Sequence, residues 1–114
     1  MHELSLCRSI YSIAERAAGD KRIGAVHLDV GALRQVIPQT LEYCWGIVVE
    51  QTPLAGSFLS INQIPAVISC NACAQQTRLS GIPMMVCGSC GSGDVRVVTG
   101  EEFLLRSLDI AKDG

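Results

Sequence analysis

Two pairs of cysteines constrain this chain more than any other feature of its sequence. Cys70 and Cys73 form one Cys-x-x-Cys motif, Cys87 and Cys90 form a second, and thirteen residues separate the two. Motifs at this spacing can place four thiolates at the corners of a tetrahedron, which is the coordination that structural zinc prefers. Because sulfur fills all four corners, no position is left for water or a substrate. We therefore predict a structural Zn(II) site rather than a catalytic one.

Iron and redox chemistry are the alternatives to zinc for these four cysteines. A tetrathiolate iron site has the same geometry. A thioredoxin-like motif instead opens a helix after a strand, and the run Gly91-Ser92-Gly93 is a poor start for a helix. A redox protein would also react readily through its thiols without a chelator, whereas bound zinc would protect them. The spacing and the glycines together favour zinc.

Charge and composition argue against a nucleic-acid-binding protein and against a membrane protein. The formal net charge is -2, and the 9 Lys and Arg residues are scattered rather than gathered in a patch. No Phe, Tyr or Trp lies between Cys70 and Cys90, so this segment offers no aromatic ring on which bases could stack. No apolar stretch approaches the roughly 18 residues of a membrane helix, and the N-terminus does not resemble a signal peptide. We expect a cytoplasmic protein, in which paired cysteines bind metal rather than form disulfides.

The apolar periodicity predicts an α+β fold. We expect helices at 3–18 and 38–51, strands at 23–30, 58–62 and 102–110, and short metal-held hairpins between 68 and 99. The predicted inner face of the first helix consists of Leu6, Ile10, Ile13, Ala14 and Ala17. The prediction is thus a three-stranded sheet with two helices on one face and a zinc ribbon inserted between the second and third strands.

This order of elements predicts a discontinuous main domain. Residues 1–66 would form its first part, 67–99 the zinc-ribbon domain, and 100–114 a C-terminal strand that needs a sheet to pair with. Cys7 and Cys44 fall on helical apolar stripes and are expected to be core thiols, with a Cys7–Cys44 redox pair as the alternative. His27 is expected to be solvated on the outer face of the first strand.

The first three residues, Met1, His2 and Glu3, offer a second kind of metal site. The α-amine, the deprotonated His2 amide and His2 Nδ1 can form fused chelate rings around one ion. Three nitrogens in a plane suit Ni(II) or Cu(II), and the amide or carboxylate of Glu3 can complete the shell. We expect Met1 to be retained, because the histidine after it is not small. Many chains begin Met-His, however, and a terminal imidazole is ordinarily just solvated, so the tripeptide alone does not assign a metal.

Four features in their order along the chain carry a resemblance to a known family. They are the N-terminal Met-His-Glu-Leu-Ser-Leu-Cys, the run Val30-Gly31-Ala32-Leu33, the two cysteine motifs, and Phe103-Leu104-Leu105-Arg106-Ser107-Leu108. Over nearly its whole length the chain resembles the HypA/HybF family, which are nickel metallochaperones of [NiFe]-hydrogenase maturation.

The resemblance implies a function and a set of metal ligands. It implies a nickel-binding domain with an inserted zinc domain, transferable Ni(II) held by His2 and by backbone nitrogens of Met1, His2 and Glu3, and structural Zn(II) on the four cysteines. It implies a HypB-type GTPase and the hydrogenase large subunit as partners, and in some relatives nickel also goes to urease. The sequence shows no recognisable set of a nucleophile, a general base and a residue that orients the base, which fits a carrier rather than an enzyme.

Two departures from the family pattern narrow these expectations. Many relatives carry an acidic residue at the start of the second helix, whereas the segment 36–41 lacks a carboxylate and the first one is Glu42. Some relatives also carry histidine beside the zinc cysteines, and this chain has none there. We therefore expect no His-dependent pH response of the zinc site. The alternative function is a zinc-ribbon adaptor in a nucleic-acid or protein complex.

Overall fold

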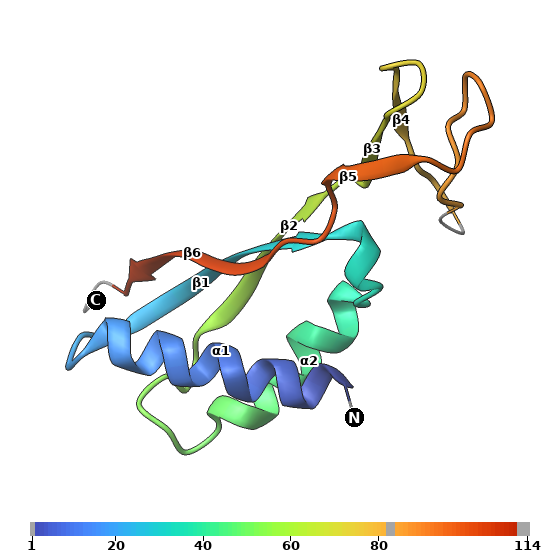
Figure 1. Cartoon of the computed structure of the whole chain (residues 1–114). Helices are drawn as coiled ribbons and strands as arrows, with labels where there is room; N and C mark the ends of the chain where they lie inside the picture. The colour runs from blue at the N-terminus through green and yellow to red at the C-terminus, as the bar shows by residue number, and fades with distance from the viewer. Residues whose placement is uncertain (1, 82–83, 112–114) are drawn as a thin grey trace. The chain divides into compact units, whose positions relative to one another are not determined.

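The strands of this protein form two separate three-stranded sheets. The computed structural model describes residues 2–81 and 84–111, without the side chain of residue 2 (Figure 1). The elements in chain order are α1 (His2–Ala18), β1 (Ile23–Gly31), a 3-10 turn η1 (Ala32–Arg34), α2 (Pro38–Val49), β2 (Phe58–Ile64), β3 (Val67–Cys70), β4 (Gln76–Arg78), β5 (Val95–Thr99) and β6 (Phe103–Ile110). The sheet orders are β2-β1-β6 and β4-β3-β5, and the predicted α+β class is confirmed.

The contacts divide the chain into two compact units. The first, called here the core unit, comprises Met1–Asp29, Val36–Asn62 and Leu104–Gly114. The second, the cysteine unit, comprises Val30–Gln35 and Gln63–Phe103. This division groups η1 with the cysteines. The domain ranges 1–66, 67–99 and 100–114 stay predictions.

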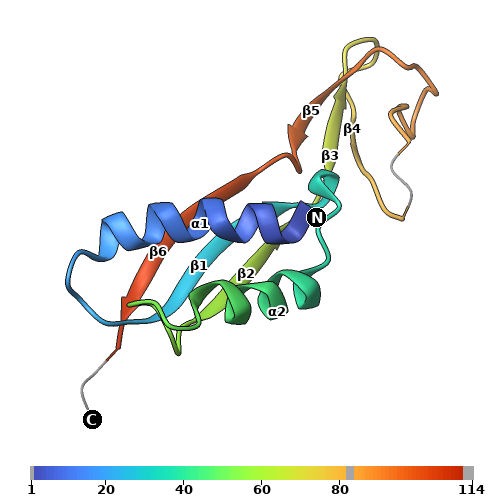
Figure 2. The same ribbon diagram turned by 90° about the horizontal axis from the view of Figure 1, so that it is seen from below.

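Helices α1 and α2 pack against each other and cover one face of the sheet β2-β1-β6 (Figure 2). In β1, Val26 and Leu28 are buried on the helix side, whereas His27 and Asp29 alternate with them and are only half-buried. At the two ends of β1, Gly31 N–H donates to Glu102 C=O and Ala111 N–H donates to Arg22 C=O. The residue numbers run in opposite directions, so β1 and β6 are antiparallel.

The buried face of α1 differs from the one predicted. It consists of Cys7, Ile10, Ala14 and Ala18, whereas Ile13 is 53% exposed and Ala17 is also exposed. The prediction was therefore wrong about these last two residues. Neighbouring residues on a helix are rotated by about 100°, so a stripe that begins at Cys7 rather than Leu6 turns Ile13 and Ala17 toward solvent. A cysteine and two alanines on the inner face also let α1 lie close to its neighbours.

Trp45 is the largest buried side chain of the core unit. It lies on α2, is 1% exposed, and its Nε1–H donates to Ser57 Oγ at 3.0 Å. Ser57 in turn donates to the carbonyl of Leu54, so the polar atoms buried beside the indole are paired. Pro38 occupies the first turn of α2, as predicted, where its missing N–H costs no helical hydrogen bond.

In the cysteine unit, β3 is the central strand and pairs antiparallel with β4 and β5. Two glycines are required where the turn after β1 meets the turn after β5. A Cβ at Gly31 would collide with the carbonyl of Gly100, and Gly100 itself has φ +120° in the left-handed region. Leu33 N–H donates to Gly100 C=O and Arg34 Nε donates to Glu101 C=O, each at 2.8 Å. These bonds explain why the turn after β1 belongs to the cysteine unit.

Candidate metal centres

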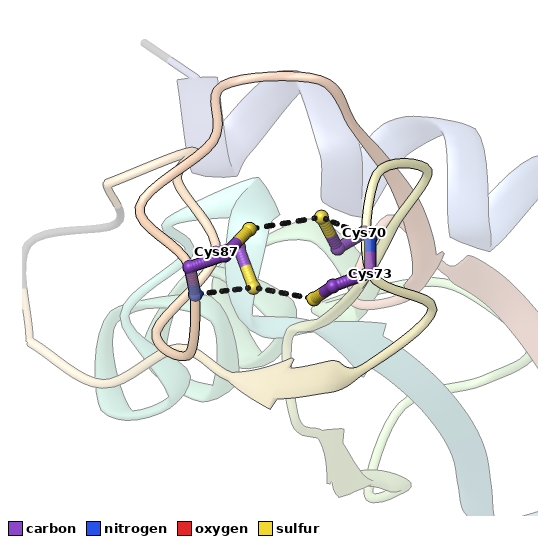
Figure 3. Close-up of side chains that lie close together, drawn as sticks. Cys70, Cys73 and Cys87 are labelled. Atoms are coloured by element: carbon purple, nitrogen blue, oxygen red, sulfur yellow. Dashed lines mark hydrogen bonds between the residues drawn. The ribbon is translucent and has the colours of Figure 1, made fainter.

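The fold brings the four cysteines of the two motifs together. Cys70 is the last residue of β3 and Cys73 follows in the next turn, whereas Cys87 and Cys90 lie on the loop between β4 and β5. All four Sγ atoms lie within 4.8 Å of one another. Figure 3 labels three of these cysteines, Cys70, Cys73 and Cys87. The two motifs, whose nearest cysteines are 14 residues apart in sequence, therefore form one cluster.

The distances within the cluster fit a tetrahedral thiolate site. Cys70 Sγ lies 3.6 Å from Cys90 Sγ, and Cys73 Sγ lies 3.6 Å from Cys87 Sγ. With a Zn–S bond of about 2.3 Å, the sulfurs of a regular tetrahedron are about 3.8 Å apart. A disulfide would need about 2.05 Å, and all four cysteines are free. The cluster thus suits one metal ion with four sulfur ligands.

Each motif directs two backbone amides at its first sulfur. Cys70 Sγ accepts hydrogen bonds from Ala72 N–H at 3.3 Å and Cys73 N–H at 3.4 Å. Cys87 Sγ accepts the corresponding bonds from Ser89 at 3.3 Å and Cys90 at 3.4 Å. The amides of Cys90 and Ser89 stabilise the thiolate and lower the pKa of Cys87 to about 6. Such donors offset the negative charge that four thiolates place around one ion.

Before metal binds, the pKa values of Cys73 and Cys90 are raised. The amide of Gln75 lowers the pKa of Cys73, but burial and hydrogen bonds with the other three thiols outweigh it and raise the pKa to about 12. Cys90 behaves similarly: the Ser92 amide lowers its pKa, but hydrogen bonding to Cys70 and burial contribute to a net rise. Metal binding must displace these protons, so the affinity for a divalent ion falls as the pH falls.

The two motifs share one backbone path. The residue after each second cysteine, Ala74 or Gly91, has a positive φ, +66° and +76° respectively. Its N–H donates at 2.9 Å to the carbonyl of the first cysteine of the motif, Cys70 or Cys87. Left-handed backbone costs an alanine about 1–2 kcal/mol relative to glycine. The sequence pattern pointed to glycine at the second motif only, and the matching role of Ala74 is visible only in the structure.

The N-terminal tripeptide is described only in part. Met1 and the side chain of His2 lie outside the described residues. Helix α1 begins at His2 and carries Glu3 in its first turn. The first amides of a helix have no acceptor within the helix, so the amides of His2 and Glu3 can take part in other bonds without breaking the helical ladder.

Two further expectations from the sequence concern the first turn of α2 and the thiols of Cys7 and Cys44. The first turn of α2 contains no acidic residue, as its sequence indicated. Cys7 is fully buried, and its thiol donates to Leu41 C=O at 3.3 Å. Burial raises the pKa of Cys7 to about 12, with Cys44 and Glu3 adding to the shift, so the thiol is protonated and unreactive at neutral pH. Cys7 is thus a core thiol, while Cys44 is half-buried, and both are free.

His27 has a partner that sequence reasoning missed. Its Nε2 atom lies 2.8 Å from a carboxylate oxygen of Asp109 on β6, and the imidazole is 25% exposed. The two residues are 82 positions apart, so no local pattern could pair them.

Among the residues that the structure describes, the four-cysteine cluster is the one group of three or more His, Cys, Asp or Glu side chains close enough to hold an ion. Within the same residues, no helix has the length and apolar character to cross a bilayer.

Comparison with known proteins gives consistent matches over nearly the whole chain. A family model described as "Hydrogenase/urease nickel incorporation, metallochaperone, hypA" matches residues 1–110. The hydrogenase maturation factor HypA of Geobacter metallireducens is 34% identical over 110 residues, covering 96% of this chain and 99% of that protein. HypA of Chloroflexus aurantiacus is 38% identical over 112 residues, covering 96% and 98%.

Two solved structures have the same fold. The solution structure of the Ni metallochaperone HypA from Helicobacter pylori matches with a TM-score of 0.65 and 20% identity, covering 95% of this chain and 96% of that one. A second solution structure of a HypA protein matches with a TM-score of 0.68 and 22% identity, covering 97% of each chain. At these identities the structures support the fold alone.

Proposed function

The chain belongs to the HypA family of nickel metallochaperones for hydrogenase maturation, and we propose that it carries Ni(II) at Met1, His2 and Glu3 and holds Zn(II) on its four clustered cysteines. Members of this family are maturation factors rather than enzymes. The observation that carries the zinc assignment is the four-sulfur cluster, whose two cross-motif distances of 3.6 Å are close to the edge of a zinc–thiolate tetrahedron.

The nickel assignment rests on the donors at the start of α1. The α-amine of Met1, the amides of His2 and Glu3, and His2 Nδ1 supply nitrogen ligands for a square-planar ion. Because α1 begins at His2, using these amides sacrifices no hydrogen bond of the helix. Cys7, a free thiol on the inner face of α1, competes poorly for nickel because its pKa of about 12 keeps it protonated.

A terminal site made mostly of backbone donors suits transfer. Its ligands belong to one short segment, so a partner can remove them in succession without unfolding a cage around the ion. We propose that a HypB-type GTPase and the hydrogenase large subunit are the partners in this transfer, and that urease maturation proteins are further recipients. The free cysteines of the cluster suit a reducing compartment, and we propose the cytoplasm.

Nickel titration of three proteins tests the terminal site. The proteins are the tag-free chain starting at Met1, the His2→Ala variant, and a chain with one extra residue before Met1. We expect the first to bind one nickel ion and the other two to lose that binding, while elemental analysis finds one zinc in all three. Wild-type nickel affinity in His2→Ala would contradict the site assignment.

A copper arm of the same titration tests selectivity. Intrinsic affinities for nitrogen ligands favour Cu(II) over Ni(II), so copper should compete at the same site and should also be lost in His2→Ala. Copper that remains bound to His2→Ala with unchanged affinity would indicate a different set of ligands.

A further inference from the structure

The four sulfurs of the cluster are not equally protected. Cys70 and Cys87 are 3% and 2% exposed, and each accepts hydrogen bonds from two backbone amides. Among the described residues no such pair of amides is directed at Cys73 or Cys90, and a single amide lowers the pKa of each, that of Gln75 and Ser92 respectively. A donated N–H draws negative charge from a thiolate and makes it a weaker nucleophile. In the zinc-loaded protein, where all four sulfurs are thiolates, the second cysteine of each motif is therefore the more reactive of its pair.

Burial then separates Cys73 from Cys90. The two occupy the same position in two motifs that share one backbone path, yet Cys73 is half-buried and Cys90 is exposed. Because neither sulfur accepts the pair of amide hydrogen bonds found at Cys70 and Cys87, the difference in exposure decides which of the two a reagent in solution reaches first.

The supporting backbone differs in the same direction. The first motif continues from the central strand β3, whose residue Cys70 still pairs with Val95 of β5. The second motif lies on the loop between β4 and β5, in a segment that contains Gly88, Gly91 and Gly93. Backbone held by a sheet opens less readily than a glycine-containing loop, so a sulfur on the second motif leaves the cluster at lower cost.

We propose that Cys90 is the modification site of the cluster, the ligand at which soft electrophiles and low-molecular-weight disulfides attack the zinc-loaded protein. This inference rests on the proposed zinc site. In the reaction with a disulfide such as oxidised glutathione, the Cys90 thiolate attacks one sulfur and the disulfide bond breaks. A mixed disulfide forms at Cys90, and the second glutathione sulfur leaves as a thiolate, so electrons and charge balance.

The modification has a defined consequence for the site. Three thiolates remain for the ion, and a fourth corner opens that the four-cysteine cluster otherwise closes. We expect zinc to be lost to a competing chelator at the rate at which Cys90 is modified. Excess thiol reverses the exchange and restores the ligand, which makes the modification a reversible redox control of the cysteine unit.

Limited alkylation of the zinc-loaded protein tests the proposal. The protein carries Cys44→Ser, which removes the half-buried thiol outside the cluster, and its zinc content is measured first. A substoichiometric maleimide is added, and each cysteine-containing peptide is quantified by mass spectrometry against the same protein denatured with chelator present. We expect Cys90 to be modified roughly tenfold faster than Cys73, with Cys70 and Cys87 slower still.

A second arm follows the disulfide itself. Oxidised glutathione is added together with a chromogenic zinc chelator, and zinc release is compared with the appearance of the Cys90 adduct. Equal rates, and recovery of zinc binding after reduction, support the proposal. With one zinc per chain, first modification at Cys73, Cys70 or Cys87, or equal rates at all four, overturns this inference and leaves the zinc site standing. Absence of stoichiometric zinc overturns the zinc site and this inference with it.

Discussion

The core unit and the cysteine unit are held together by different interactions. Of the eight largest side chains that are less than 2% exposed among the described residues, Ile68 alone belongs to the cysteine unit. The core unit has the others, among them Trp45, Leu28 and Leu41, and buries them under two helices. The core unit is therefore stabilised mainly by apolar burial, and because the cysteine unit buries so few large side chains, we expect its folding to depend on a bound metal ion.

The cysteines show the same contrast. Cys7 in the core unit is protected because it is buried and its pKa is raised to about 12. In the cysteine unit Cys87 is also buried, yet the amides of Cys90 and Ser89 hold a negative sulfur in place and lower its pKa to about 6. Once a chelator removes the metal, Cys87 should therefore react with alkylating agents, whereas Cys7 should stay unmodified until the core unit unfolds.

Breaking the metal site should have the largest effect and should affect one unit only. In Cys73→Ser, one of four thiolates is lost, and structural zinc sites contribute about 10–16 kcal/mol of apparent folding free energy. We expect amide hydrogen exchange in β3 and β5 to lose protection while the far-ultraviolet circular dichroism of α1 and α2 is largely retained. Complete loss of helicity would show that the two units do not fold separately.

The reciprocal change in the core unit should be the next largest. Trp45→Ala removes a buried indole and its hydrogen bond to Ser57, and should lower the free energy of unfolding by about 3–5 kcal/mol. Tyr43→Ala on the same helix is the matched control: its side chain is 72% exposed, so we expect a change within about 0.5 kcal/mol. Urea denaturation with zinc analysis measures both. Loss of zinc in folded Trp45→Ala protein would argue against independent units.

A pair of glycine substitutions sharpens the contrast at the level of single contacts. In Gly31→Ala the new methyl group meets the Gly100 backbone, and we expect the cysteine unit to lose about 1–3 kcal/mol. In Gly46→Ala, on α2, the new methyl group has no neighbour within 4 Å, and helix propensity should add about 0.5–1 kcal/mol to the core unit. Hydrogen exchange of the Leu33 amide reports the first change and thermal unfolding the second. If Gly31→Ala stabilises the protein as much as Gly46→Ala does, the close approach at Gly31 is not restrictive.

The smallest expected effect compares the two cysteine motifs with each other. Ala74→Gly relieves an alanine at φ +66° and should stabilise the first motif by about 1 kcal/mol, whereas Gly91→Ala should destabilise the second by a similar amount. Chelator competition for zinc measures both variants. We expect the change in zinc affinity to have opposite signs in the two variants, and a gain in affinity in Gly91→Ala would contradict the shared backbone path.

Much of this architecture is readable from local patterns. The cysteine spacing predicts the cluster, and the alternation of Val26 with His27 and Leu28 predicts the buried face of β1. Such features depend on residues a few positions apart. The inner face of α1 was harder, because Leu6 and Ile13 are apolar as well and nothing local distinguishes a stripe that begins one residue later.

The features that sequence reasoning missed depend on distant contacts. Gly31 and Gly100 must both be small because they approach each other, and the His27–Asp109 pair joins β1 to β6. The relative exposure of Cys73 and Cys90 depends on what the rest of the cysteine unit covers. A pattern within one segment holds no information about any of these contacts.

X-ray absorption of one sample loaded with both metals tests whether nickel and zinc occupy chemically different sites in the two units. We expect the nickel spectrum to show a planar shell of nitrogen and oxygen ligands without sulfur, and the zinc spectrum to show four sulfurs. Sulfur in the nickel shell, with zinc displaced from the cysteines, would contradict it.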